Sequence, residues 1–312
     1  MTFLKTRKNE CQHNTFAAML LLDGKIVSQA VKKELALATA RLLEQGKRPP
    51  HLAAVLVGNN GASETYVAGK VKSCAEIGYT STLIRFEDNI EEKKLLDKID
   101  ELNNDDAIDG ILVQLPLPKQ ISEPKVIESI SPDKDVDGFH PVSVGRLVQG
   151  LDTFIPATPY GIMLMFEHYN IETKGKHAVI IGRSNIVGRP MSILLSSNVK
   201  YGNCTVTVCH SHTKNLNALT QQADIVIAAL GRPEFVKADM IKQGAIVIDV
   251  GITRVDDTSA AKGYRIKGDV DFKGVLEKAS ALSPVPGGVG LMTIAGLMKN
   301  TMNAYLRRTP YS

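Results

Sequence analysis

A tyrosine and a lysine four residues apart are the first side chains in this sequence that could do chemistry. Residues 66–70 read YVAGK, which places Tyr66 and Lys70 on one face of a predicted helix. We expect that helix to begin at Ser63 as its N-cap and to end just before Gly78. A lysine beside a phenol under partly apolar cover can donate or accept a proton near neutral pH. For the pair alone, a solvated helix face without a catalytic role is the alternative.

Three further segments carry polar side chains next to turn-forming glycine or proline. They read ILVQLPLP (111–118), DKDVDGFHP (133–141) and SPVPGGVGLMT (283–293). A plain core element would not carry polar groups at these positions. We therefore predict that the three segments and the YVAGK helix form one site.

Bulk composition narrows the class of protein. A chain of 312 residues is long enough for two domains, and 44% hydrophobic and 22% charged residues are typical of a globular protein. The net charge of +4 is spread along the chain without a lysine or arginine block, so we expect no nucleic-acid partner. No apolar run approaches the ~18 residues of a membrane helix. We therefore expect no membrane partner and a cytoplasmic location.

The cysteines and the N-terminal segment favour the same compartment. The sequence has no CxxC pair and no cysteine at a metal-ligand spacing from histidine, so we expect reduced thiols and no metal site. The four cysteines are Cys11, Cys74, Cys204 and Cys209. Residues 1–18 lack the apolar core of a secretory signal, and we predict a disordered tail there, with a transit peptide as the alternative.

Helical and strand patterns alternate through the first half of the chain. Apolar residues at helical spacing predict a helix over 24–46, and the buried run HLAAVLVG (51–58) predicts a strand. After the YVAGK helix we expect a strand in STLIRF, a charged helix at 91–103 and a strand in DGILVQLP. This alternation predicts a parallel sheet with helices on both faces.

A second α/β series follows FIPATP (154–159), whose prolines indicate a domain hinge. Helices are expected at 160–169 and 190–197, with strands in HAVIIG, CTVTVCH, DIVIAAL and AIVIDVG. This order is typical of a Rossmann-type fold. The last helix (291–306) has no strand after it, and we expect it to return to the first domain.

The sequence thus predicts a two-domain α/β protein. Residues 19–157 together with 291–312 are expected to form an N-terminal αβ-layered catalytic domain, and residues 158–290 a Rossmann-type NAD(P)-binding domain.

The segment GRSNIVGRP (182–190) stands where a dinucleotide fold needs its phosphate-binding turn. Gly182 is expected to make the tight turn and Gly188 to allow close packing of helix on strand, although Ser184 replaces the middle glycine of the usual pattern. Backbone N–H groups at the following helix would hold a pyrophosphate. A tight turn without a ligand is the alternative.

The end of the second strand of this series indicates which dinucleotide binds. Sites selective for NAD usually place Asp or Glu there, but this chain reads CHSHTK (209–214) without a carboxylate. We expect Arg183, Ser184, Ser211 and Lys214 to surround a 2′-phosphate, which favours NADP over NAD. For Lys214 and the histidines, the start of a solvated helix is the alternative.

With all these segments in view, the chain resembles the bifunctional methylenetetrahydrofolate dehydrogenase/methenyltetrahydrofolate cyclohydrolase family. The resemblance runs from residue 22 to about residue 306 and rests on YVAGK, DGILVQLPLP, DKDVDG, GRSNIVGRP, HSHTKN, GAIVIDVGI, GDVDF and PVPGGVGLMT, in that order. It implies oxidation of 5,10-methylenetetrahydrofolate by NADP and hydrolysis of the methenyl product to 10-formyltetrahydrofolate, two steps of one-carbon metabolism. It also implies a homodimer joined through the nucleotide domains.

The resemblance assigns roles to single residues. Lys70 would stabilise developing charge and relay a proton, with Gln114 hydrogen-bonded to it and helping to keep it partly neutral. Tyr66 would pack against the pterin and aminobenzoyl groups, and Asp137 would accept hydrogen bonds from the pterin. The remaining implied contacts are Pro286, Gly287 and Gly288 with folate, and Gly182, Arg183, Ser184, Gly188, His210, Ser211 and Ile252 with the cofactor.

Two positions depart from the family pattern. Leu291 stands where the family usually has proline, and we expect a looser start of the last helix there. His212 occupies a position that the family often fills with lysine or arginine.

Three other functions remain open at this point. They are another two-domain dehydrogenase such as a shikimate or amino-acid dehydrogenase, a monofunctional or NAD-preferring methylenetetrahydrofolate dehydrogenase, and a folate- or nucleotide-binding protein without turnover. The YVAGK, VQLPLP and DVDG segments argue against the first, and the presence of Lys70 and Gln114 argues against the last.

Overall fold

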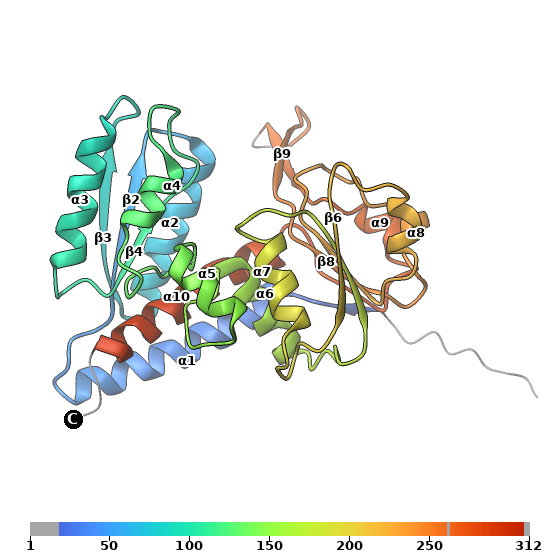
Figure 1. Cartoon of the computed structure of the whole chain (residues 1–312), viewed down its shortest axis with the longest axis horizontal. Coiled ribbons are helices and arrows are strands. Elements are labelled where there is room, and N and C mark those ends of the chain that lie inside the picture. The colour runs from blue at the N-terminus through green and yellow to red at the C-terminus, as the bar shows by residue number, and fades with distance from the viewer. Residues whose placement is uncertain (1–18, 261–262, 309–312) are drawn as a thin grey trace, which may run out of the picture.

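A computed structural model describes residues 19–260 and 263–308. It has two α/β lobes that are connected by a pair of long helices, as Figure 1 shows. The predicted tail at residues 1–18 lies outside the described residues. No helix in the described ranges is long and apolar enough to cross a membrane.

The first lobe is built on a parallel three-stranded sheet in the order β3-β2-β4. Strand β2 is buried along almost its whole length, as expected for a parallel strand covered on both faces. Every helix and strand predicted for this half is present, and no end is shifted by more than three residues. The elements are β2 (His51–Val57), α2 (Gly61–Glu76), β3 (Thr80–Phe86), α3 (Glu92–Asn104), β4 (Gly110–Val113), α4 (Glu123–Ser129) and α5 (Pro141–Val148).

The second lobe holds a parallel six-stranded sheet in the order β1-β11-β8-β7-β5-β6. The four predicted strands are its β5, β6, β7 and β8, and the predicted parallel α/β sheet is confirmed. These strands lie in the order β6-β5-β7-β8, which is a doubly wound order in which the second strand of the series lies at the edge. Its elements are α6 (Ala157–His168), β5 (His177–Ile181), α7 (Gly188–Ser196), β6 (Thr205–Cys209), α8 (Leu216–Thr220), β7 (Ile225–Ala228), the 3₁₀ turn η1 (Ala238–Met240), β8 (Ile246–Asp249) and α9 (Phe272–Val275).

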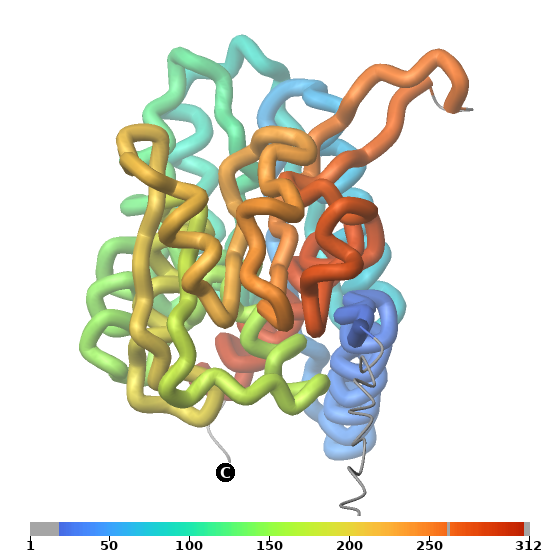
Figure 2. The backbone as a smooth tube through the Cα atoms, turned by 90° about the vertical axis from the view of Figure 1, so that its right-hand side faces the viewer, coloured from blue at the N-terminus to red at the C-terminus, as the bar shows by residue number. Residues whose placement is uncertain are grey.

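Several short strands of this lobe were not predicted from the sequence. Strands β1 (Leu20–Leu21) and β11 (Ala281–Leu282) pair with each other at one edge of the large sheet. An antiparallel hairpin, β9 (Thr253–Asp256) and β10 (Tyr264–Lys267), follows β8 and projects from the body of the molecule (Figure 2). Each is only two to four residues long, which is too short for a periodic pattern to be recognised.

Two long helices, α1 (Gly24–Glu44) and α10 (Val289–Arg308), connect the lobes. Helix α10 packs mainly on α6 and α1 and also touches α2 and β4, so the predicted return of the last helix to the first domain is confirmed. It begins two residues earlier than predicted, and the Leu291 N–H donates to the Gly288 carbonyl within its first turn. One cluster of buried apolar side chains runs from β2 through α10 to β5. The lobes therefore share a core on the side where their sheets meet the helices.

Candidate active site

Helix α2 carries Tyr66 and Lys70, but its start differs from the prediction. Its N-cap is Asn60, whose side-chain oxygen accepts hydrogen bonds from the N–H groups of Ala62 (3.0 Å) and Ser63 (3.1 Å). The prediction of Ser63 as the cap is therefore wrong. Asn60 is an equally good capping residue that stands three positions earlier, and Ser63 is buried within the helix.

Lys70 is nearly buried, with 6% of its surface exposed, and its amine points to the end of β4. Its Nζ donates a hydrogen bond of 3.0 Å to Oε1 of Gln114, and Nε2 of Gln114 donates to the Leu115 carbonyl at 2.7 Å. The second bond fixes the amide so that its oxygen faces the lysine. Burial lowers the pKa of Lys70 from its ordinary value, while the nearby Asp137 carboxylate opposes that shift.

The second and third aspartates of the DKDVDG segment have different surroundings. Asp135 is buried, and its carboxylate accepts hydrogen bonds from the Phe139 N–H, the His140 N–H and the Ser143 hydroxyl. Burial raises the pKa of Asp135 to about 7, against the effect of these bonds. Asp135 thus fixes the loop, and the half-buried Asp137 is presented to the lysine. Burial raises the pKa of Asp137, and the Lys70 charge opposes that shift.

Helix α10 ties this loop to the predicted hinge between the domains. Asn300 is buried, and its Nδ2 donates to the carbonyls of Val136 and Ile155, each at 2.8 Å. One side chain therefore satisfies two carbonyls from segments about twenty residues apart. Its position on α10 also orients the loop that carries Asp137.

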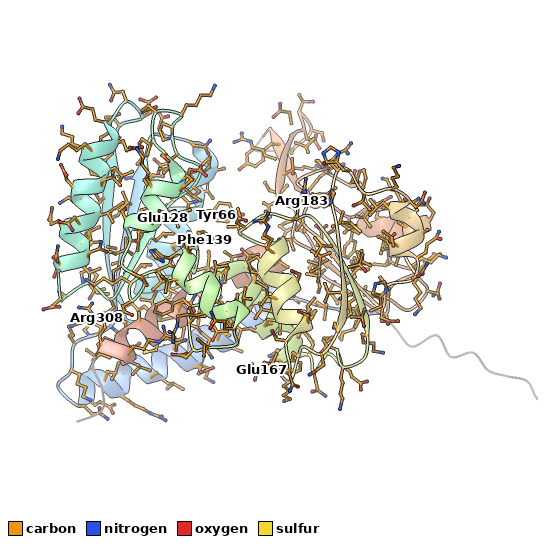
Figure 3. The ribbon with its side chains drawn as sticks, in the orientation of Figure 1. Tyr66, Glu128, Phe139, Glu167, Arg183 and Arg308 are labelled. Atoms are coloured by element: carbon orange, nitrogen blue, oxygen red, sulfur yellow. The ribbon has the colours of Figure 1, made fainter. Side chains whose placement is uncertain are left out.

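A cavity of about 320 Å³ brings Tyr66, Lys70, Gln114 and Asp137 together. Its other wall comes from the second lobe, through Ile186, Val187, Val250 and Ile252. Figure 3 shows Tyr66 and Phe139 on the first lobe facing the side where Arg183 lies on the second. Polar groups of one lobe thus face an apolar wall of the other, an arrangement that suits a flat ligand with one polar edge.

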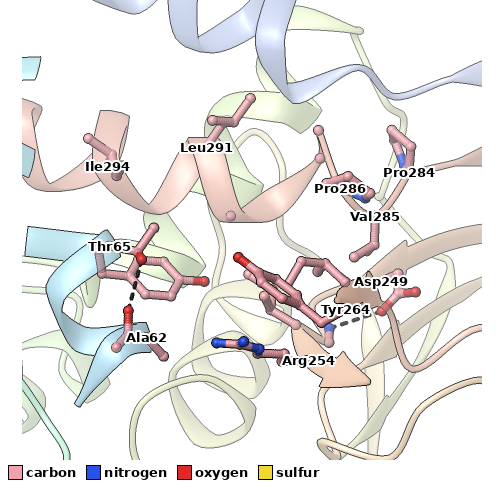
Figure 4. Close-up of a pocket in the computed structure, with 18 residues that line it drawn as sticks. Ala62, Thr65, Asp249, Arg254, Tyr264, Pro284, Val285, Pro286, Leu291 and Ile294 are labelled. Carbon is pink, nitrogen blue, oxygen red and sulfur yellow. Dashed lines mark hydrogen bonds between the residues drawn. The ribbon is translucent and has the colours of Figure 1, made fainter. Parts of the chain in front are cut away.

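A second cavity, of about 430 Å³, adjoins the first and contains Pro286, Gly287 and Gly288 (Figure 4). Tyr66, Ile252 and Gly290 line both cavities. Gly288 has a packing role as well, because a Cβ at this position would lie 2.4 Å from the Pro284 carbonyl oxygen. Gly287 has φ near +104°, a conformation that glycine adopts without strain.

The turn after β5 has the close approaches expected of a phosphate-binding turn. A Cβ on Gly182 would lie 2.1 Å from the Ala229 carbonyl oxygen, and one on Gly188 would lie 2.1 Å from the Gly182 carbonyl oxygen. The Ser184 hydroxyl accepts hydrogen bonds from the N–H groups of Val187 (3.1 Å) and Gly188 (3.4 Å). The serine in place of the middle glycine therefore supports the entry into α7.

A third cavity, of about 320 Å³, lies against this turn. It is lined by Gly182, Arg183, Ser184, His210 and Ser211, and among the described residues no carboxylate takes part in its lining. The donor set fits an anionic group such as a phosphate. Lys214 and Gly188 are not among its lining residues, and Ile252 lies in the other two cavities.

The loop 210–213 is held by its own side chains. The His210 N–H donates to the Thr213 hydroxyl at 2.8 Å, and Nδ1 of His210 accepts from the His212 N–H at 3.2 Å. His210 thus sets the shape of the loop that carries Ser211 to the cavity.

Arg232 is a lining residue of the third cavity that the sequence analysis missed. Its guanidinium lies over the Phe235 ring, 4.7 Å from the centroid. It follows β7, and the carboxyl ends of parallel strands are where such folds bind ligands. Its place just after DIVIAAL is the signal that could have identified it.

In the part of the chain that the structure describes, no three His, Cys, Asp or Glu side chains are grouped as metal ligands would be. Cys74, Cys204 and Cys209 are buried free thiols. Burial raises the pKa of the Cys204 thiol to about 11, which makes it a poor nucleophile.

Comparison with known families matches both halves of the chain. The model described as tetrahydrofolate dehydrogenase/cyclohydrolase, catalytic domain, matches residues 22–137. The model described as tetrahydrofolate dehydrogenase/cyclohydrolase, NAD(P)-binding domain, matches residues 156–309.

Curated relatives are similar over nearly their full length. The chain is 60% identical over 291 residues to the Bifunctional protein FolD of Flavobacterium johnsoniae, covering 93% of this chain and 99% of that protein. It is 58% identical over 286 residues to the protein of the same name from Cytophaga hutchinsonii, covering 92% and 99%.

Solved structures agree with the fold. The bifunctional enzyme FolD, methylenetetrahydrofolate dehydrogenase/cyclohydrolase, of Campylobacter jejuni superposes with a TM-score of 0.87 at 48% identity, covering 93% of this chain and 100% of that one. The N5,N10-methylenetetrahydrofolate dehydrogenase-cyclohydrolase of Trypanosoma brucei, complexed with NADP cofactor and inhibitor, gives 0.90 at 35% identity, covering 95% and 100%.

Proposed function

The chain belongs to the tetrahydrofolate dehydrogenase/cyclohydrolase family, as its motifs predicted, and from this premise we propose that the adjoining cavities around Tyr66 form one active site for two reactions. The enzyme oxidises 5,10-methylenetetrahydrofolate with NADP to the methenyl form and hydrolyses that product to 10-formyltetrahydrofolate. Membership of this family sets aside the shikimate and amino-acid dehydrogenases as alternatives.

The observation that supports this site best is the buried lysine. Lys70 is held 3.0 Å from Gln114, and it lines the same cavity as Tyr66 and Asp137. Because burial lowers its pKa, a larger fraction of this amine is neutral at a given pH than of an exposed lysine. A neutral amine beside a reactive carbon can serve as a base, and its protonated form as an acid.

Folate binding follows from the same cavity walls. We assign Asp137 to accept hydrogen bonds from the amino and ring N–H groups of the pterin, and Tyr66 to pack against the pterin and aminobenzoyl rings. We assign Pro286, Gly287 and Gly288, which line the adjoining second cavity, to contact the same ligand. Apolar Ile186, Val187 and Ile252 cover the other side and exclude water.

The cofactor site is the third cavity. Arg183, Ser184 and Ser211 would hold the 2′-phosphate, with Arg232 as an additional cation, and His210 would shape the loop that positions Ser211. Gly182 and Gly188 would let the backbone approach the pyrophosphate. When bound, NADP supplies the hydride acceptor for the dehydrogenase reaction.

In the cyclohydrolase reaction we assign Lys70 as the proton relay. Water adds to the methenyl carbon and gives one proton to the neutral Lys70 amine. The lysine ammonium then donates this proton to N5 as the carbon–N5 bond breaks. The second proton of the water is released to solvent as the formyl carbonyl forms. Gln114 keeps the amine pointed at the reacting carbon through its hydrogen bond.

The test is a parallel measurement of NADP and NAD reduction with 5,10-methylenetetrahydrofolate, followed by hydrolysis of added methenyltetrahydrofolate. We expect fast NADP reduction, little NAD reduction, and methenyl hydrolysis well above the rate in buffer. Turnover with NAD alone would contradict the phosphate assignment of Arg183, Ser184 and Ser211. Absence of both activities would contradict the catalytic assignment of Lys70.

Three further assignments complete this proposal. Residues 19–157 with 291–312 form the catalytic domain and 158–290 the NADP domain, although Leu20–Leu21 pairs with the larger sheet.

The protein is a homodimer joined through the NADP domains, as the family resemblance implies, and sedimentation showing only monomer would contradict this. The location is cytoplasmic, supported by reduced buried thiols, and cell fractionation would test it.

A further inference from the structure

The second cavity contains a cation that the proposed reactions do not use. Arg254, on strand β9, is an exposed residue whose side chain lies at the rim of this cavity (Figure 4). Its guanidinium lies over the ring of Tyr264 on strand β10, 3.7 Å from the centroid. This stacking holds the charge at the cavity mouth without neutralising it.

Arg254 differs from the other arginine of the same hairpin. Arg265 forms an ion pair with Asp257 at 2.6 Å, whereas Arg254 has no Asp or Glu within ion-pair distance among the described residues. In the strand register Arg254 pairs with Ile266, and Arg265 pairs with Val255. The two arginines are therefore on opposite faces of the hairpin, and the unpaired one faces the cavity.

Among the described lining residues, the other charged side chain already has its hydrogen-bond partners within the protein. Asp249 is buried, and its carboxylate accepts hydrogen bonds from the N–H groups of Gly251 (2.9 Å), Asp269 (2.8 Å) and Val270 (3.0 Å). The wall across from Arg254 is apolar and includes Leu291 and Ile294 of α10 (Figure 4). Within residues 19–260 and 263–308, the cavity thus offers apolar sides and one positive charge without an ion pair at its mouth.

The two cavities meet at Tyr66, which sets the direction of a bound folate. If the pterin lies by Lys70 and Asp137, the aminobenzoyl ring passes Tyr66 and the remainder of the molecule continues into the second cavity. That remainder is a glutamyl group with two carboxylates. An arginine can bind a carboxylate through two parallel hydrogen bonds.

We propose that Arg254, held by Tyr264, binds a carboxylate of the glutamyl tail of the folate substrate. The inference rests on the proposed function, because it takes the ligand of the first cavity to be a folate. Since Arg254 is exposed, the effect on affinity is modest, on the order of 2- to 5-fold, and it weakens with salt.

The test compares 5,10-methylenetetrahydrofolate with 5,10-methylenetetrahydropteroate, which lacks the glutamyl group. The readout is the ratio of kcat/KM for the two substrates with NADP, in the intact protein and in Arg254→Met. Methionine keeps an apolar side chain over Tyr264 but removes the charge. Arg265→Met, on the other face of the hairpin, is the matched control, and melting temperatures of all three proteins check folding.

We expect the unaltered protein to prefer the glutamylated substrate by about fivefold, mainly through KM. Arg254→Met should lose this preference, Arg254→Lys should keep part of it, and Arg265→Met should keep all of it. In the unaltered protein alone, raising the salt concentration should reduce the preference, so the inference is testable even if a variant fails to fold.

Two results would overturn the inference and leave the proposed function intact. They are equal turnover of both substrates by the unaltered protein, or a preference that Arg254→Met and added salt leave unchanged. Turnover of neither substrate would instead remove the proposed function, and this inference with it.

Discussion

The catalytic cavity and the cofactor cavity of this protein are built in opposite ways. Lys70 is buried, and its amine is fixed by Gln114, 44 residues away in sequence. Arg183 and Ser184 are exposed on a turn whose hydrogen bonds are local, such as that from the Val187 N–H to the Ser184 hydroxyl. The catalytic site depends on packing between distant segments, whereas the cofactor cavity is lined by short loops that follow β5, β6 and β7 and are held largely by local bonds.

This difference shows that proton transfer and phosphate recognition depend on different features of the structure. Burial changes the proton affinity of Lys70, so that its chemistry depends on the tertiary structure around it. Exposed arginines keep their charge whatever surrounds them, so recognition of a phosphate depends mainly on their position. Substitutions in the first cavity should therefore change rate, and those in the third should change cofactor affinity.

The largest effect is expected for Lys70→Met. Loss of a general acid–base group lowers a rate by about 10²- to 10⁴-fold, so methenyl hydrolysis should fall by that factor while folate binding is kept. Lys72→Met on the same helix is the matched control, because the Lys72 side chain is 78% exposed and pairs only loosely with Glu76. Hydrolysis assays and folate titration check this. Hydrolysis by Lys70→Met near the unaltered rate would assign the proton relay to another group.

Asn300→Leu tests whether distant packing supports the catalytic cavity. It leaves the buried carbonyl of Val136 and the partly buried carbonyl of Ile155 without this donor, at a cost of about 2–3 kcal/mol in the free energy of unfolding. Urea denaturation measures the loss. The same variant should lower kcat and leave the KM for NADP nearly unchanged. The reason is that Asp137, which lines the catalytic cavity, directly follows Val136, whose carbonyl loses its donor. A larger change in the KM for NADP would break the distinction between the two cavities.

The pH dependence of hydrolysis should report the buried lysine. Because burial lowers the pKa of Lys70, the neutral amine forms below the ordinary lysine pKa of 10.5. Below the lowered pKa, kcat/KM should fall as the pH falls, by about tenfold per pH unit, as the amine becomes protonated. Rates corrected for spontaneous hydrolysis in buffer check this. A pH profile whose midpoint equals the pKa of an exposed lysine would mean that burial does not lower the pKa of Lys70.

Arg183→Gln should act on the cofactor alone. We expect the KM for NADP to rise about tenfold, roughly 1.4 kcal/mol, with little change for NAD or for kcat. Arg189→Gln is the control, since Arg189 bonds Asn185 and does not line the cofactor cavity. Steady-state kinetics with both dinucleotides distinguish the outcomes. Equal effects on NADP and NAD would place Arg183 away from the 2′-phosphate.

The smallest effect is expected for Ser184→Ala. It removes the acceptor of two turn N–H groups and should cost about 1 kcal/mol of stability, as loss of a helix cap does. Ser211→Ala, where no such bond is lost among the described residues, should leave the melting temperature unchanged. Thermal denaturation of both variants decides between a structural and a purely ligand-binding role for Ser184.

Much of the fold could be predicted because its long elements have local signals. Strands such as His51–Val57 and His177–Ile181 are continuous apolar runs, as buried parallel strands are. The hairpin at Thr253–Asp256 could not be predicted, since a strand of four residues depends on its partner. The misplaced helix start has a similar cause. Asn60 and Ser63 are both good caps, but the chain is extended at Asn60 and helical from Gly61 onward, so that Ser63 lies within the helix.

The sequence by itself determined the elements, the glycine turn and the set of polar residues available for chemistry. These follow from periodicity and from backbone preferences, which act over a few neighbouring residues. The family resemblance implied that Lys70 meets Gln114, but this contact joins distant segments and forms only in the tertiary structure. Only the tertiary structure showed that Asp135 fixes the loop while Asp137 faces the cavity. It also showed that Arg254 reaches the second cavity without an ion pair among the described residues. Hydrogen-bond partners and burial come from segments far apart in the chain, and burial is what sets proton affinity.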